Sequence, residues 1–186
     1  DKRNDRLITT NGHYLSASEE VAGLGGNREF ARSIGDARYY HKIWGDLTLR
    51  GKLELGHMVP LASDGYVQLS ERFRLGGPNN LRGYPAYGVG PTQASGDGNI
   101  HVVGGKSEMF TMWELEYPIA NEIGLKFVTF YDAGNAFDGF KLNLEEDVGW
   151  GIRWFSPLGP LRFEWGYLLK HAGNGSQFNF MIGPPF

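Results

Sequence analysis

Cysteine is absent from this chain of 186 residues, which excludes a disulfide framework, thiolate chemistry and metal clusters built on cysteine. The sequence also lacks any run near the roughly 18 consecutive apolar residues of a membrane-spanning helix, and its mean hydropathy is −0.35. Neither charge sign dominates, since 18 basic and 21 acidic residues give a net charge of −3, so nucleic acid is not an expected partner. These absences exclude a helical membrane protein but leave a membrane β-barrel open, because its strands alternate apolar and polar residues.

Enzyme and cofactor motifs are missing as well. The five histidines, at positions 13, 41, 57, 101 and 171, show no spacing typical of a zinc site. No Gly-x-Ser-x-Gly nucleophile motif and no complete phosphate-binding loop is present. We therefore expect a non-enzymatic protein with no cofactor and no metal.

The chain is rich in glycine, with 28 residues, and in aromatics, with 12 Phe, 9 Tyr and 5 Trp, a combination that favours sheet. Leucine and isoleucine alternate with charged residues over 43–56, so one face of this segment is apolar and the other is charged. Near the end of the chain Phe178, Phe180 and Phe186 fall on one face in the same way.

This period of two predicts eight strands, near 12–22, 28–42, 43–57, 106–118, 123–134, 147–156, 160–169 and 177–186. The even number suits an all-β, antiparallel, eight-stranded transmembrane β-barrel. The segment 58–105 is the one long excursion, and its glycine- and serine-rich part predicts a surface loop.

The most informative stretch, ERFRLGGPNNLRGY, lies within this excursion and contains Arg82. Farther along the chain Asp132 interrupts the apolar run 127–131. A charge in a protein interior is costly unless it is paired and hydrogen-bonded. We therefore expect the loop arginine to fold onto the strand aspartate.

These two segments, together with GWGIRWFSPLGPLRFEWGYLL at 149–169 and the final FNFMIGPPF, resemble the superfamily of BamA-like insertases and two-partner-secretion translocators. In that family the loop before the twelfth of sixteen strands carries an LGG…RGY/F signature, whose arginine reaches acidic residues inside the barrel. The resemblance assigns a loop motif to Phe73, Leu75, Gly76 and Gly77 and a loop latch to Arg82, Gly83, Tyr84, Glu116 and Asp132. The latch either stabilises the barrel or opens during substrate handling.

The resemblance covers the C-terminal half of the family barrel and implies one outer-membrane domain over 1–186, with no POTRA repeats. It implies a non-enzymatic role in outer-membrane protein or lipid biogenesis, with outer-membrane lipid and the barrel-assembly machinery as partners. Two alternatives stay open: a small closed structural or surface-interaction barrel, and a homodimer that forms a sixteen-strand translocation pore. Closing eight strands alone would leave room only for side chains.

The predicted inward faces carry charges of both signs, which favours a salt-bridge network in the lumen over a conduction path. These residues are Asp46, Arg50, Lys52, Glu54, Glu114, Glu116, Lys126, Asp132, Arg153, Arg162 and Glu164. The aromatic residues with outward parity, Trp150, Trp154, Trp165 and Tyr167, are typical of an interfacial girdle. Phe178, Phe180 and Phe186 resemble the C-terminal signal that bacterial barrel-assembly machinery recognises.

Overall fold

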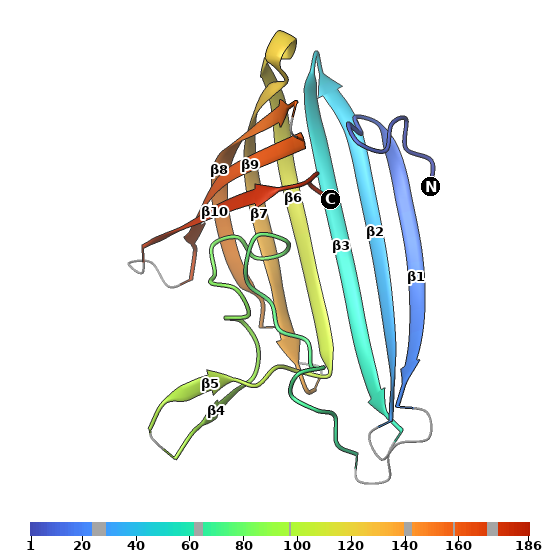
Figure 1. The fold of residues 1–186 in the computed structure, drawn as a ribbon, viewed down its shortest axis with the longest axis vertical. Coiled ribbons are helices and arrows are strands. Elements are labelled where there is room, and N and C mark those ends of the chain that lie inside the picture. The colour runs from blue at the N-terminus through green and yellow to red at the C-terminus, as the bar shows by residue number, and fades with distance from the viewer. Residues whose placement is uncertain (24–28, 62–64, 97, 140–142, 158, 171–174) are drawn as a thin grey trace.

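A single curved antiparallel sheet dominates the computed structural model, which describes all residues except 24–28, 62–64, 97, 140–142, 158 and 171–174 (Figure 1). Its strands, in spatial order, are β1 (Gly12–Ala22), β2 (Phe30–Trp44), β3 (Leu47–Pro60), β6 (Ser107–Ala120), β7 (Leu125–Phe137), β8 (Glu145–Ser156), β9 (Gly159–Leu168) and β10 (Ser176–Ile182). A separate hairpin pairs β4 (Thr92–Ala94) with β5 (Ile100–Val102), and η1 (Asn121–Ile123) forms the β6–β7 turn. Over the described residues no helix has the length and apolarity to cross a membrane.

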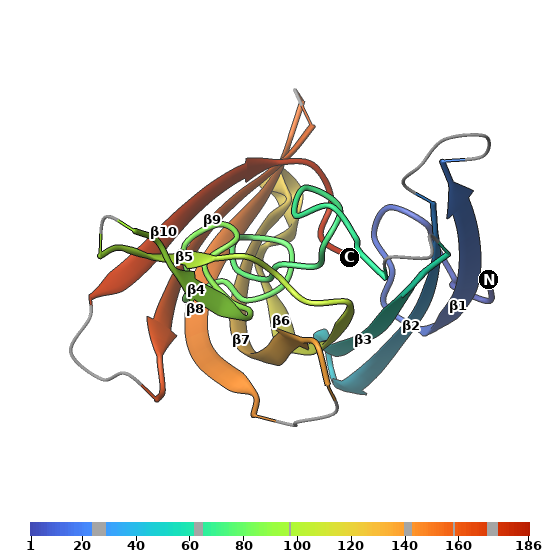
Figure 2. The ribbon, with the colours of Figure 1, turned by 90° about the horizontal axis from the view of Figure 1, so that it is seen from below.

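The sheet is open. Within the described part of the chain β1 pairs only with β2, and β10 pairs only with β9. Seen from below, β8, β9 and β10 curl around the segment between β3 and β6, while β1 lies at the far end of the sheet (Figure 2). The prediction of an all-β antiparallel fold with eight long strands is confirmed, but the predicted closed eight-stranded barrel is corrected. A barrel of eight strands encloses only side chains, whereas this concave face holds a whole loop.

The two faces of the sheet differ in chemistry, as the alternating pattern predicted. Aromatic rings form rows across the convex face: the centroids of Trp150 and Trp165 are 4.7 Å apart, and those of Trp165 and Phe178 are 4.9 Å apart. Trp154 and Tyr167, also predicted to point outward, are likewise exposed. The concave face instead buries charged residues.

Most strand boundaries differ from the predicted ones by one to four residues, and three differences matter for the argument. The β2–β3 turn falls at Gly45–Asp46, so Asp46 is exposed in a turn rather than inward on a strand. The glycine- and serine-rich stretch predicted as irregular loop contains the β4–β5 hairpin. The last strand ends at Ile182 instead of residue 186. The predicted start of the second strand, residue 28, lies outside the described residues.

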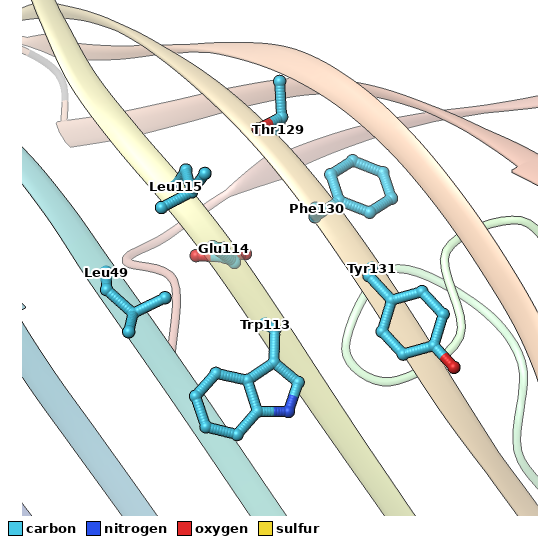
Figure 3. A pocket seen from close by; sticks show the side chains of 7 residues that line it. All are labelled: Leu49, Trp113, Glu114, Leu115, Thr129, Phe130 and Tyr131. Atoms are coloured by element: carbon cyan, nitrogen blue, oxygen red, sulfur yellow. The ribbon is translucent and has the colours of Figure 1, made fainter.

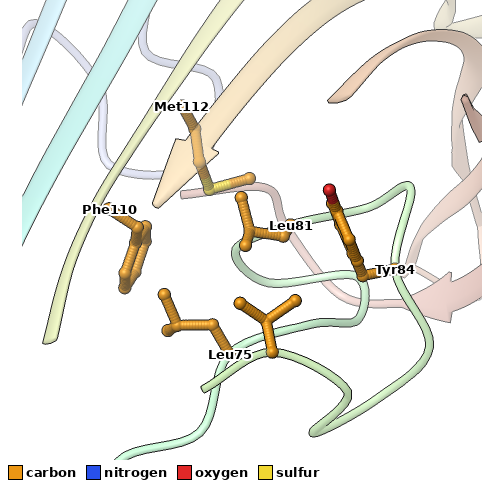
Figure 4. Packing of buried hydrophobic residues seen from close by; sticks show 6 residues of the cluster. Leu75, Leu81, Tyr84, Phe110 and Met112 are labelled. Atoms are coloured by element: carbon orange, nitrogen blue, oxygen red, sulfur yellow. The ribbon is translucent and has the colours of Figure 1, made fainter. Parts of the chain in front are cut away.

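A small apolar core joins the long loop to the sheet (Figure 4). Leu75, Leu81 and Tyr84 of the loop pack with Phe110 and Met112 of β6, and all five side chains are buried. The loop is therefore held against the concave face by hydrophobic contact as well as by charge.

Replacing Leu81, which is fully buried in this core, should lower the free energy of unfolding. We expect Leu81→Ala to cost about 2–5 kcal/mol, because a cavity would remain between loop and strand. Unfolding of the detergent-solubilised protein in denaturant measures the loss. Leu69→Ala, at a side chain that is 45% exposed, should change it by less than about 0.5 kcal/mol. Equal losses at the two leucines would contradict the loop core.

Candidate functional site

The loop enters the concave face through a tight turn built on two glycines. Gly76 and Gly77 have φ angles of 107° and 102°, a backbone region that side chains other than hydrogen disfavour. The Asn80 side-chain oxygen accepts hydrogen bonds from the backbone N–H groups of Gly76 and Leu81, at 2.8 and 2.7 Å. The turn is thus closed by its own side chain and presents the next residue, Arg82, to the sheet.

Two cross-strand glycines, Gly149 on β8 and Gly166 on β9, form a floor of the sheet without side chains. Gly166 faces the loop backbone, and Gly149 faces the Phe130 ring. A Cβ atom on Gly166 would lie 2.6 Å from the carbonyl carbon and oxygen of Arg82, and one on Gly83 would lie 2.5 Å from the Asp147 Cβ. Any side chain at either position would therefore push the loop away from the sheet.

Arg82 is fully buried and binds acids from three strands. Its Nε and Nη2 atoms donate to the two carboxylate oxygens of Asp132 on β7, both at 2.7 Å. Its Nη1 donates to Glu114 on β6 at 2.5 Å and lies 3.4 Å from Glu164 on β9. The guanidinium also lies 3.6 Å from the ring centroid of Phe130, a cation–π contact. The geometry is that of a bidentate arginine–carboxylate pair with extra partners.

The loop main chain is held as firmly as the side chain. The Arg82 N–H lies 3.3 Å from Asp132, and the Asn179 side-chain amide on β10 donates to the Arg82 carbonyl at 2.9 Å. Burial alone would lower the pKa of the guanidinium, but the carboxylates of Asp132 and Glu114 outweigh burial and raise that pKa. Arg82 therefore stays charged at any pH that the protein meets.

A second buried arginine pairs with Glu114 and Glu164, two of the acids that Arg82 contacts. Arg153 on β8 donates to Glu114 at 2.6 and 2.8 Å, to Glu164 at 2.7 and 3.0 Å and to Glu116 at 3.1 Å. The outer members of the network are Arg50, Lys126 and Arg162, each paired with one or more of these glutamates. Of the residues predicted to form an inward salt-bridge network, most meet here.

The structure changes one predicted partner of Arg82. Asp132 is in contact as expected, but the carboxylate that Arg82 reaches on β6 is Glu114, not Glu116. Glu116 binds Arg50, Lys126 and Arg153 instead. Both glutamates point inward by strand parity, and the depth to which the loop descends decides which one meets Arg82.

Two further acids, both on β8, lie near the loop. Glu145 accepts a hydrogen bond from the Tyr84 hydroxyl at 2.8 Å, and burial together with this bond raises the pKa of Tyr84. Asp147 is fully buried opposite Asp132, and neither of its carboxylate oxygens has a hydrogen-bond partner among the described side chains and backbone. The inward parity that identified Arg153 extends to Asp147 and could have found it. Among the described residues no group of three or more His, Cys, Asp or Glu is arranged to hold a metal ion.

The three C-terminal phenylalanines do not share one face, contrary to the prediction. Phe178 and Phe180 are about half exposed on the convex face. Phe186 instead turns inward: it packs against the loop core, its ring faces the Arg50 guanidinium, and its carbonyl accepts a hydrogen bond from Arg50. Gly183, with φ 136°, and the following prolines explain the change, because proline has no N–H with which to continue a strand.

The other motif residues brace the loop. Phe73 forms a bridge with Gly105, and Leu75 forms one with Val89, so the loop folds back on itself as two short antiparallel contacts. The Leu75–Val89 bridge closes the segment of the loop that carries Arg82.

Comparison with known proteins assigns this architecture. The model of the Omp85 superfamily domain matches residues 1–186. The chain belongs to the Omp85 superfamily. It is 30% identical over its full length to the outer membrane protein assembly factor BamA of Nitratidesulfovibrio vulgaris, of which it covers 24%. Over 52% of the chain it is 30% identical to the human sorting and assembly machinery component 50 homolog, of which it covers 20%.

The fold is similar to a solved barrel. The crystal structure of BamA from Haemophilus ducreyi lacking POTRA domains 1–3 superposes with a TM-score of 0.82 and 19% identity, over 97% of this chain and 39% of the other. The chain thus spans about a quarter of the length of the BamA of N. vulgaris. Family membership confirms the predicted superfamily and the outer-membrane location.

Removing the Arg82 side chain should leave its acids buried without their main partner. We expect Arg82→Ala to lower the free energy of unfolding by about 3–5 kcal/mol, the usual cost of breaking a buried ion pair from one side. Arg82→Lys should lose less, because lysine keeps the charge but not the bidentate geometry. Denaturant unfolding measures both, with Arg6→Ala, whose side chain is 84% exposed, as the control. We call Arg82 with its acids on β6, β7 and β9 the hub. A loss of stability at Arg82 no larger than at Arg6 would contradict the importance of the hub.

A methyl group at Gly166 tests the glycine floor without touching any charge. Gly166→Ala should cost about 1–3 kcal/mol through overpacking and should make the loop easier to cleave by protease, because Arg82 and Gly83 must move away. Gly35→Ala is the matched strand control, since a Cβ there would meet no atom within 4 Å. If both variants are cleaved at the wild-type rate, the loop does not depend on the floor.

Proposed function

We propose that the chain is the latch-bearing wall of an outer-membrane barrel that assists assembly of other outer-membrane proteins without enzymatic chemistry. The observation that carries the proposal is the buried contact of Arg82 with acids on β6, β7 and β9. One loop residue thereby links three strands. The relatives named as assembly factors support the role.

The strands of the sheet differ in how they contact Arg82 and its acids. The strands β6 to β10 all contact the loop or the hub, either through ion pairs or through Asn179. The strands β1 to β3 join the hub through Arg50 and its pairs with Glu114 and Glu116, and β2 also meets the long loop directly through the ion pair of Arg32 with Glu71. Loss of the Arg82 contacts would therefore remove the charged part of the loop attachment and leave its apolar core, while most of the network around Arg153 would remain. This is the behaviour expected of a latch that opens during client handling.

The open edges of the sheet favour a larger barrel over a small closed one. β1 and β10 each have one described neighbour, and the concave face already holds the loop. We propose that further strands complete the wall, either from elsewhere in the protein or from a second copy of this chain. Native mass spectrometry separates these two sources. The C-terminal assembly signal at Phe178, Phe180 and Phe186 stays a prediction, and it would be read from the unfolded chain, because Phe186 is turned inward after folding.

Reconstitution tests the function. Full-length protein in liposomes should accelerate the folding of an added outer-membrane barrel protein over protein-free liposomes. Arg82→Ala, assayed well below its own melting temperature, should lower that acceleration at least tenfold, whereas Arg6→Ala should retain it. Client folding at the same rate in protein-free liposomes would refute the assembly role, and full activity in Arg82→Ala would make the latch purely structural.

A further inference from the structure

Two hollows lie next to each other on the convex face, separated by the indole of Trp113. The first hollow, of about 360 Å³, lies between Trp113 and the side chains of Leu49, Leu115 and Tyr131 (Figure 3). The second, of about 400 Å³, extends from Trp113 across β3 and β2 to Leu15 on β1.

One position in the lateral row of residues between the hollows has no side chain, and the Trp113 indole occupies that place. His13, Tyr39, Gly51, Trp113 and Tyr131 are successive cross-strand neighbours from β1 to β7. Trp113 leans over the glycine, where a Cβ would lie 2.8 Å from its six-membered ring. The indole is therefore a ridge, and the surface falls away on both sides of it.

The surroundings indicate what fills the hollows. The convex face of an outer-membrane strand wall meets hydrocarbon, and Leu15, Leu53 and Leu115 are between 37% and 68% exposed there. Two apolar hollows on either side of one side chain match the two acyl chains of one lipid. A single-chain molecule would leave one hollow empty.

The polar end of the lipid is set by the direction of the strands. His13 and Tyr39 line the second hollow, and the Tyr39 ring stacks on His41, with centroids 6.2 Å apart, toward the short turn at Gly45–Asp46. Short turns of outer-membrane barrels lie on the periplasmic side, and long loops on the outside. Imidazole and phenol groups can donate hydrogen bonds to a phosphate.

We infer that one two-chain phospholipid of the periplasmic leaflet binds astride Trp113, with an acyl chain in each hollow and its phosphate beside His13 and Tyr39. The second hollow depends on two small residues in its lining, Gly51, over which the indole lies, and Ala37. Two residues that contact Arg82, Glu114 and Phe130, also line the first hollow, whereas the second hollow shares no residue with the Arg82 contacts.

Native mass spectrometry of the delipidated full-length protein in detergent, titrated with phosphatidylethanolamine, tests the site. The wild type should bind one phosphatidylethanolamine more than Gly51→Leu or Ala37→Leu, and filling should weaken that binding at least tenfold. Ala17→Leu adds the same side chain at an exposed position of β1 outside the two hollows and should bind as the wild type does. Single-chain lysophosphatidylethanolamine should bind at least tenfold more weakly.

Two results would overturn the inference: filled variants that bind phosphatidylethanolamine as well as the wild type, or equal affinity for the single-chain lipid. Gly51→Leu could fail to fold if Trp113 cannot move. In that case Ala37→Leu alone decides, because a leucine at position 37 enters the second hollow from β2 and does not replace Gly51 under the indole. Unchanged binding in that folded variant would equally reject the site.

Discussion

Burial of the Arg82 guanidinium is the interaction on which the rest of the structure depends. A buried cation must be paired, and this one is met by Asp132, Glu114 and Glu164 from three strands. Those acids exceed the charge of one arginine, so Arg153 is needed behind them. A loop residue thereby specifies the inward chemistry of half the sheet.

Electrostatic pairing alone would not place the loop, because the backbone must come close enough for the guanidinium to reach. Gly166 supplies that space, Gly149 makes room for the Phe130 ring under the guanidinium, and Gly83 approaches Asp147 from the loop side. The same closeness is incompatible with closing these eight strands alone into a barrel. A concave face that accepts a folded loop has a larger radius than one packed with side chains alone. The charge pairing, the glycines and the curvature of the sheet together allow the loop to lie inside the concave face.

The need for a partner could be predicted from residues 127–131 and Asp132, because a charge after an apolar run must be paired. The LGG…RGY signature then selected Arg82 among the three arginines of its stretch, Arg72, Arg74 and Arg82. Strand parity likewise identified the inward charges. Parity could not choose between Glu114 and Glu116, since they lie two residues apart on one face and only the depth of the loop separates them. Nor does alternation extend past Gly183, where backbone conformation redirects Phe186.

The inner hub and the outer hollows are two faces of the same strand segments. Arg50 on β3, Glu114 on β6 and Phe130 on β7 contact the network around Arg82. Their neighbours in the chain, Gly51, Trp113 and Tyr131, form the lateral row on the outer face. A shift of one residue in strand register would exchange the two faces, putting charges into lipid and the indole into the lumen. Each face therefore opposes a slip that would also damage the other. The register of the wall is fixed from both sides, although only the inner side holds the loop.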